Sequence, residues 1–295
     1  MQKTLTEIQL LKFSLLSLLM LSLGCGAKRS LGSKSGNTIE MQLVRNATVR
    51  LDIGKSSLLI DPILGAKGSQ EPIPFSNGLN NPLVDLPYTV DKVLSDVDAI
   101  LVTHYHPDHF DRAAEEFVPK DMLLFCQPSD RERLVEKGFT NLIPIDTVHQ
   151  WSGIQISRYG ASHHQGATGQ PPFGESSSYG IEALGKKVLV TGDAILDNKL
   201  DSTVDTVEPD VIIANTGECQ FSEPNEVLAP GMTMTLTKEE LVKLSAQRPK
   251  TQIIAVHLEA INHCTLDRKA LKDYIKDQGR GHHVLVPDDG ESISF

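Results

Sequence analysis

The sequence has few cysteines and fewer basic than acidic side chains. Lysine and arginine number 28 against 38 aspartate and glutamate residues, and the formal net charge is −10. Such an acidic surface repels a phosphate backbone, so binding of nucleic acid is not expected. The four cysteines are widely spaced and predict neither a disulfide framework nor a thiolate metal site. We therefore expect Cys126, Cys219 and Cys264 to be small buried hydrophobic side chains.

Long hydrophobic runs are also scarce, and the longest covers residues 13–24 (FSLLSLLMLSLG). This segment is shorter than the ~20 apolar residues that a transmembrane helix needs. Lys3 and Lys12 precede it and Cys25 follows it directly, which is the layout of a signal peptide over residues 1–25. The sequence therefore predicts export.

Gly24 and Cys25 together resemble the bacterial lipoprotein signal, in which the cysteine is acylated and becomes the new N-terminus. Polar residues 26–38 would then act as a flexible tether. Ser22 and Glu7 depart from that signal, so an ordinary cleaved signal or an uncleaved anchor is the alternative. We expect a lipid on Cys25 to hold the protein on the membrane of the bacterial cell envelope, periplasmic or at the outer surface.

The rest of the chain has a globular composition and contains no internal repeat. Three short strand patterns, punctuated by Asn46 and Gly54, predict a β-meander at its start. Residues 62–90 are rich in proline, glycine and asparagine, which predicts a long irregular loop of a kind that is usually functional. After this loop, strand and helix signals alternate.

The expected strands cover residues 41–44, 48–52, 57–60, 99–103, 123–126, 142–145, 154–158, 179–183, 187–190, 211–214 and 252–256. Helices are expected at residues 130–137, 238–245 and 266–277. Ser129 and Thr265 are the expected N-caps of the first and last helix, and Thr237 with Glu240 forms a capping box for the middle one.

The strongest functional signal is the segment Thr-His-Tyr-His-Pro-Asp-His at residues 103–109, at the end of the apolar strand 99–103. Ten histidines in 295 residues predict about 0.2 in a window of six, and three are present. Imidazole and carboxylate groups are preferred ligands of zinc and similar divalent metals. A group of surface histidines is the alternative, but protonated rings so close together would repel one another. The segment therefore predicts a metal site.

This segment is similar to the His-x-His-x-Asp-His hallmark of the metallo-β-lactamase superfamily. The superfamily's other motifs follow in order, at residues 58–62 (LLIDP), 159–166 (YGASHHQG), 188–193 (VLVTGD) and 253–257 (IIAVH). Residues 257–264 (HLEAINHC) look like the branch that includes L-ascorbate-6-phosphate lactonase and uncharacterised relatives. His106 argues against the di-iron flavoprotein reductases, which carry a carboxylate at that position.

The resemblance implies an α/β (α+β) fold, a four-layer αββα sandwich that forms a single domain over about residues 39–295, with metals at one edge. Two divalent ions are expected, zinc first, with manganese or iron as alternatives. The implied ligands are His104, His106 and His163 for the first metal, Asp108, His109 and His257 for the second, and Asp193 as the bridge. A metal-bridged hydroxide is the implied nucleophile. Asp61 in the first motif is expected to be structural.

Several assignments near these motifs stay open. His164 could replace His163 as the ligand, although the spacing from Gly160 favours His163. His263 could contact the substrate or protonate a leaving group, or it could be a hydrogen-bonded structural residue. Asn215, Thr216 and Asn262 are expected to offer neutral hydrogen-bond donors to the substrate.

The predicted function is hydrolysis of a small ester or lactone, with Asp108, Asp193 and His263 as the catalytic residues. Segments 62–90 and 216–236 contain no lysine or arginine except Lys67, so a polyanionic substrate is disfavoured. A phosphodiesterase acting on a small phosphoester is the alternative among enzymes. A non-catalytic metal-binding lipoprotein is the alternative outside them.

Overall fold

The computed structural model describes residues 36–165 and 174–295. The predicted signal peptide, Cys25 and the tether as far as residue 35 lie outside this part of the chain. Export and lipid attachment therefore stay predictions. Within the two described ranges, no helix is long and apolar enough to span a bilayer.

The first of two mixed sheets has the strand order β14-β1-β2-β3-β4-β5-β6. Its strands are β1 (Ile39–Arg45), β2 (Thr48–Ile53), β3 (Ser56–Ile60), β4 (Ala99–Val102), β5 (Leu124–Cys126), β6 (Leu142–Pro144) and β14 (Ser292–Ser294). The pairs from β14 to β3 are antiparallel, which confirms the expected meander, and the pairs from β3 to β6 are parallel.

The second sheet has the order β13-β12-β11-β10-β9-β8-β7. Its strands are β7 (Val148–Trp151), β8 (Ile154–Ala161), β9 (Ser176–Ala183), β10 (Lys186–Val190), β11 (Val211–Asn215), β12 (Gln252–Val256) and β13 (Val284–Leu285). The pairs from β7 to β10 are antiparallel and those from β10 to β13 are parallel.

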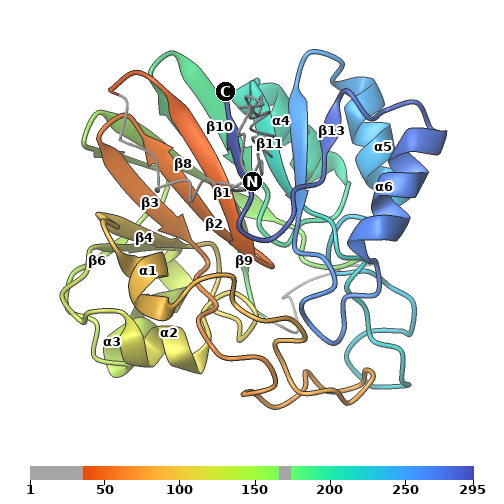
Figure 1. The fold of residues 1–295 in the computed structure, drawn as a ribbon, viewed down its shortest axis with the longest axis horizontal. Coiled ribbons are helices and arrows are strands. Elements are labelled where there is room, and N and C mark those ends of the chain that lie inside the picture. Colours follow the sequence, from red (N-terminus) through yellow and green to blue (C-terminus); the bar gives the residue numbers. More distant parts are fainter. Residues whose placement is uncertain (1–35, 166–173) are drawn as a thin grey trace, which may run out of the picture. The chain divides into compact units, whose positions relative to one another are not determined.

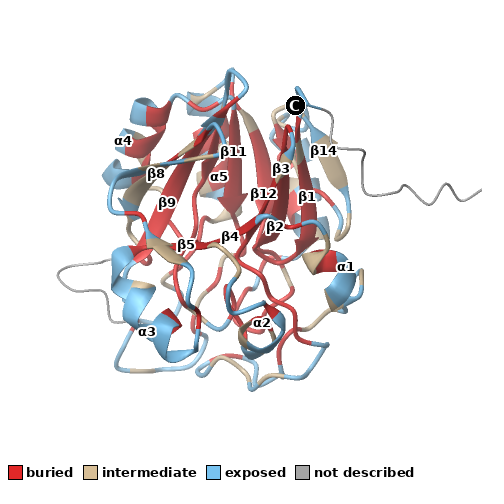
Figure 2. Ribbon diagram, turned by 90° about the vertical axis from the view of Figure 1, so that its left-hand side faces the viewer, coloured by how far each residue is buried: buried red, intermediate tan, exposed pale blue. Residues whose placement is uncertain are grey.

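Helices cover the outer face of each sheet (Figure 1). The helices on the first sheet are α1 (Val90–Leu94), α2 (Arg112–Phe117) and α3 (Arg131–Glu136), and those on the second are α4 (Asn198–Val207), α5 (Lys238–Gln247) and α6 (Arg268–Asp277). Figure 2 shows that buried residues concentrate in the sheets while the outward faces of the helices are exposed. The expected four-layer αββα sandwich is confirmed.

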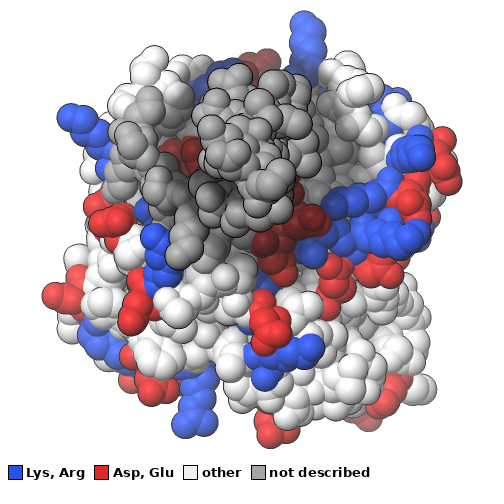
Figure 3. Space-filling view, in the orientation of Figure 1, with Lys and Arg blue, Asp and Glu red and all other residues white. Residues whose placement is uncertain are grey.

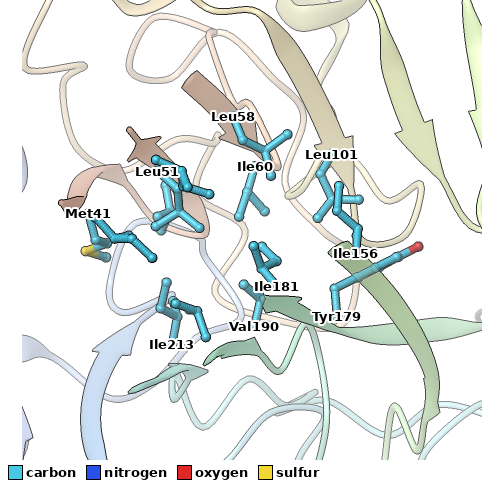
Figure 4. Close-up of a cluster of buried hydrophobic side chains, with 14 of the residues drawn as sticks. Met41, Leu51, Leu58, Ile60, Leu101, Ile156, Tyr179, Ile181, Val190 and Ile213 are labelled. Carbon is cyan, nitrogen blue, oxygen red and sulfur yellow. The ribbon is translucent and has the colours of Figure 1, made fainter. Parts of the chain in front are cut away.

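Continuous apolar runs form the central strands because these strands are buried on both faces. In β4, Ala99 and Leu101 face the second sheet, whereas Ile100 and Val102 pack against the helices. The core between the sheets joins residues such as Leu51 and Leu101 to Tyr179 from the other sheet (Figure 4). The strands from β3 to β6 are parallel, and so are those from β10 to β13. The loops that follow these strands therefore start from well-packed positions.

Two of the expected N-caps are wrong. Helix α3 begins at Arg131, and the hydroxyl of Ser129 donates to Glu175 instead of capping it. Helix α6 begins at Arg268, with Asp267 rather than Thr265 as its N-cap, because the Asp267 carboxylate accepts from the backbone N–H of Ala270. The capping box of Thr237 and Glu240 on α5 is confirmed. Helices α1, α2 and α4 and strands β7, β13 and β14 were not expected from the sequence.

Two of the cysteines expected to be hydrophobic side chains form a disulfide instead. Cys219 and Cys264 are joined although 45 residues separate them in the sequence. Cys219 follows β11 and Cys264 follows β12, and these strands are parallel neighbours. Spacing along the chain does not show that the loops after neighbouring strands meet, so the expectation was wrong for this pair. Cys126 is a free, buried cysteine, as expected.

Candidate metal centre

The loop that follows β4 is fixed to the loop that follows β3. Asp61 accepts hydrogen bonds from the backbone N–H and the hydroxyl of Thr103, both at 2.7 Å. Oδ2 of Asp61, which accepts from the Thr103 hydroxyl, also lies 2.8 Å from Nδ1 of His109. Asp61 thus orients residues of the histidine-rich segment without entering the cluster of its ligand atoms, which is the structural role expected for it.

The first cluster of potential ligand atoms contains His104, His106 and His163, whose atoms all lie within 4.8 Å of one another. Nε2 of His163 is 3.2 Å from Nδ1 of His106. Nδ1 of His104 lies 3.1 Å from the hydroxyl of Thr103, so its Nε2 is the nitrogen left for a ligand. The segment after β4 and the segment after β8 therefore supply one site together.

The second cluster contains Asp108, His109, Asp193 and His257. Nε2 of His257 lies 3.2 Å from Nε2 of His109 and 3.6 Å from Oδ2 of Asp108. His257 adopts a φ of +61°, an unfavourable conformation for a residue with a side chain, directly after β12. Gly217 lies beside it, where a Cβ would collide with the carbonyl oxygen of His257. Gly217 thus allows the loop after β11 to approach the backbone of His257 closely.

Asp193 belongs to the second cluster and also faces the first. Its Oδ1 is 3.2 Å from Nε2 of His109, and its Oδ2 is 3.9 Å from Nε2 of both His104 and His163. Gly192 makes this position possible, because it has a φ of +56° and a Cβ there would lie 2.5 Å from the carbonyl oxygen of Ser177. The carboxylate is placed where a ligand shared by two cations would be.

The charges of the clusters suit divalent cations. Burial lowers the pKa of His104 well below its ordinary value and lowers the pKa of His163 to about 4, so both rings are neutral at pH 7. Burial alone would raise the pKa of Asp108 and Asp193, but neighbouring histidines outweigh it and hold both pKa values well below the ordinary range. Ionised carboxylates and neutral imidazoles are the donors that zinc and similar ions take.

One buried nitrogen also argues for a cation. Nε2 of His104 has no hydrogen-bond partner among the described residues, and buried polar atoms in proteins are normally satisfied. A cation at the first cluster would satisfy it. The residues present therefore fit a metal centre.

His109 differs from the other rings. Burial would lower its pKa, but the carboxylates of Asp193 and Asp61 outweigh this effect and raise the pKa well above its ordinary value. A proton must therefore leave Nε2 of His109 before that atom can bind a cation. Metal binding is expected to strengthen as the pH rises, because protons compete for this ligand.

Residues 57–258 match the family model described as the beta-lactamase superfamily domain. The chain belongs to this superfamily. It is 34% identical over 259 residues to UPF0173 protein YddR of Bacillus subtilis, which covers 85% of this chain and 98% of that protein. The family and the fold expected from the sequence motifs are confirmed.

Two solved structures from the comparison are similar over nearly the whole described domain. A possible metal-dependent hydrolase from Veillonella parvula has 30% identity and a TM-score of 0.80, covering 87% of this chain and 99% of the other. The isothiocyanate hydrolase from Delia radicum gut bacteria has 29% identity and a TM-score of 0.79, with the same coverage. This superfamily member is thus similar to metal-dependent hydrolases.

Residues of both clusters form the floor of a pocket of about 320 Å³. Its floor residues are His106, Asp108, His163, Asp193 and His263, and its walls are Ile73, Pro74, Phe75, Pro107, Phe221, Val227 and Met234. The walls were not identified from the sequence, because apolar residues in irregular loops have no periodicity. The only signals were the unusual lengths of the two loops that supply most of them, around residues 62–90 and 216–236.

The three neutral donors expected for the substrate are already used inside the protein. The amide of Asn215 donates to Oδ1 of Asp193 at 2.8 Å, and the hydroxyl of Thr216 donates to the carbonyl oxygen of Ala214. Asn262 bonds to a neighbouring loop through both of its amide atoms. The expectation was wrong because the sequence does not show which polar side chains are consumed by folding.

The structure also separates the two adjacent histidines of the superfamily's third motif. His163 belongs to the first cluster, whereas Nδ1 of His164 lies 2.8 Å from the carbonyl oxygen of Gln165 and the ring is outside both clusters. We expect His163→Ala to weaken metal binding at the first cluster by more than about 100-fold. Loss of a residue that only hydrogen-bonds to a metal ligand already lowers metal affinity about 10–100-fold. His164→Ala is the matched variant and should retain metal. Elemental analysis after dialysis measures both, and the reverse result would move the ligand to His164.

Proposed function

We propose that the protein hydrolyses a small, uncharged and apolar ester or lactone with the help of divalent metal ions held by the two clusters. The observation that carries this proposal is the pocket, in which walls of apolar side chains stand over a polar floor. Among the described residues, the pocket lining includes no lysine or arginine. An apolar substituent would be desolvated by the walls while its reactive carbon lies at the floor.

A charged substrate suits this pocket less well. A phosphoester would depend on the metals to balance its charge, because no lysine or arginine in the described part of the chain lines the pocket. On the face of the molecule drawn in Figure 3, a group of basic side chains toward the right-hand edge has acidic side chains beside it. The lining of the pocket favours a neutral small molecule over a phosphoester or a polyanion.

The residues of the two clusters have separable tasks in this proposal. His104, His106 and His163 would hold one cation, and Asp108, His109 and His257 would hold the other, with Asp193 shared between them. Such cations lower the pKa of a water molecule and polarise the oxygen of the substrate. The Asn215 amide fixes Asp193 by donating to its Oδ1. The protein therefore needs no serine or cysteine nucleophile.

His263 faces the pocket from the loop after β12, with Nε2 3.7 Å from Oδ2 of Asp108. Burial lowers the pKa of His263 to about 4. The ring is thus neutral at pH 7, and donating a hydrogen bond to the substrate suits it better than donating a proton as imidazolium. We assign His263 the task of orienting the substrate.

An isothiocyanate is the second candidate substrate. One similar structure is named as an isothiocyanate hydrolase. Isothiocyanates are uncharged and carry an electrophilic carbon next to an organic substituent. The apolar walls formed by Phe75, Phe221 and Met234 would accept that substituent as they would accept the apolar part of an ester.

The proposal is tested with a panel of phenyl esters, lactones, aryl isothiocyanates and a phosphodiester, using the full chain loaded with zinc, manganese or iron. We expect uncharged substrates with an aromatic substituent to have the highest kcat/KM. Phe221→Ala should raise KM for them about 10-fold, because burying an aromatic ring is worth about 1.5–3 kcal/mol. Phe117 is half exposed on α2 outside the pocket lining, and Phe117→Ala is the matched control. The proposal would be contradicted if the phosphodiester were turned over faster than the uncharged substrates. It would also be contradicted if no substrate of the panel were turned over.

A further inference from the structure

Asn262 is buried, with 3% of its surface exposed, and every hydrogen-bonding position of its amide is occupied. Oδ1 accepts from the backbone N–H of Ile73 at 3.0 Å and from the amide of Asn81 at 2.9 Å. Nδ2 donates to the carbonyl oxygen of Ile73 at 3.0 Å and to the hydroxyl of Ser76 at 2.5 Å. The backbone N–H of Asn262 donates in turn to Oδ1 of Asn81. One side chain thus holds both ends of the segment 73–76.

That segment contains a strained residue of the pocket wall. Phe75 has a φ of +61°, a conformation that is unfavourable for a residue with a side chain. Such a conformation persists only where its surroundings determine it. The bonds from Asn262 fix Ile73 and Ser76, which flank Phe75 on both sides in the sequence.

Phe75 in turn contacts the loop that contains Phe221. Its carbonyl oxygen accepts from the backbone N–H groups of Ser222 and Glu223, at 2.9 and 3.1 Å. Its ring meets the ring of Phe221 edge to face, with 5.6 Å between the ring centres. Phe75 and Phe221 both line the pocket over the metal clusters. The positions of Phe75 and Phe221 therefore depend on each other, and both depend on the conformation of residues 73–76.

We propose that Asn262 is a specificity-determining residue, which positions Phe75 and Phe221 around the apolar part of the substrate. Asn262 acts through the wall and has no bond to the residues of either metal cluster in the described chain. It determines which substituents are bound, while the clusters determine whether any substrate reacts. The inference rests on the proposed hydrolysis only in its use of turnover as a readout.

The kinetic test compares Asn262→Ala with the wild-type protein on two esters that differ in size. For an aromatic ester that fills the walls, KM should rise about 10-fold, since several buried hydrogen bonds are lost together. For a methyl or acetyl ester too small to reach Phe75, kcat/KM should stay within about twofold, and the metal content should be unchanged. A merely structural role would lower turnover of both esters equally, and that result would overturn the proposal.

Two further variants complete the kinetic series. Ser76→Ala removes a single one of the four bonds and should give a smaller rise in KM for the aromatic ester, even if Asn262→Ala folds poorly. Asn80→Ala is the matched control, because Asn80 lies in the same loop, is exposed and bonds only to Gly68 in the described structure. An effect of Asn80→Ala equal to that of Asn262→Ala would show a general response of the loop and would overturn the proposal.

A measurement without substrate separates this inference from the proposed function. Hydrogen exchange of the backbone amides of Ile73 and of residues 222–223 should be at least about 10-fold faster in Asn262→Ala. The Ile73 amide loses its acceptor, and the Phe75 carbonyl oxygen that accepts from residues 222–223 is no longer held in place. If the wild type hydrolyses no ester but the exchange rises, the proposed function fails and the positioning role stands. If exchange is unchanged, Asn262 does not order the wall and the inference fails.

Discussion

Asp193→Asn is expected to lower kcat/KM by at least about 10³-fold and to lower the metal content. The change keeps the shape of the side chain but removes its charge and replaces one acceptor oxygen with an NH₂ group. Both oxygens are needed, because Oδ1 faces His109 while Oδ2 faces His104 and His163. Loss of a residue that only supports a metal ligand costs about 10–100-fold, so loss of a shared ligand should exceed that range. Steady-state kinetics and elemental analysis on the same preparation measure both effects.

Asp197→Asn is the matched control for this substitution. Asp197 is the N-cap of α4, where Oδ1 accepts from the backbone N–H groups of Lys199 and Leu200. Asparagine caps helices as well as aspartate does, so stability, metal content and activity should remain those of the wild type. Full metal content together with full activity in Asp193→Asn would show that Asp193 is not a ligand.

Breaking the disulfide between Cys219 and Cys264 is expected to lower the free energy of unfolding by about 4 kcal/mol. This value follows from the entropy that a cross-link across 45 residues removes from the unfolded chain. The sulfur atoms of Cys219 and Cys264 also lie 3.5 and 3.4 Å from Nδ1 of His257, so metal affinity should fall together with stability. Denaturant unfolding with and without a thiol reductant measures the first effect. Metal titration measures the second.

The double variant Cys219→Ala/Cys264→Ala should already have the lower stability and should not respond to reductant. Cys126→Ala keeps the disulfide and should respond as the wild type does, which makes it the control for loss of a buried thiol. Two free thiols at positions 219 and 264 in the unreduced protein would refute the bond itself. If the protein is exported, as its N-terminal sequence predicts, an oxidising compartment would preserve this bond.

Much of the fold was predictable because its central strands are short apolar runs. Residues 99–103 were assigned correctly as a strand buried on both faces, and α5 was recognised from the capping box of Thr237 and Glu240. Helices α1 and α2 are too short to give a helical period. Helix α4 does have such a period, with Leu200, Val204 and Val207 buried on one face, and it was overlooked.

The candidate metal ligands were predictable from the sequence, whereas the disulfide and the pocket walls were not. His104, His106, Asp108 and His109 are close in the sequence, and the family resemblance located His163, Asp193 and His257, which the structure brings to the same place. The disulfide, the apolar walls and the occupied amide of Asn262 depend on loops meeting in space. Their residues carry no pattern of their own, so a sequence reading cannot distinguish a free asparagine from one whose bonds are all made.

The loop after β12 combines functions that many enzymes distribute over several segments. Within eight residues it contains the potential metal ligand His257, the pocket residue His263, the disulfide partner Cys264 and the wall-positioning Asn262. A substitution there would alter chemistry, selectivity and stability at once, which leaves natural variation little freedom in this loop. New substrate preferences would arise more readily in Val227 or Met234, which line the pocket from a loop outside both metal clusters. If the proposed hydrolysis holds, directed evolution of substrate preference should therefore begin with that loop.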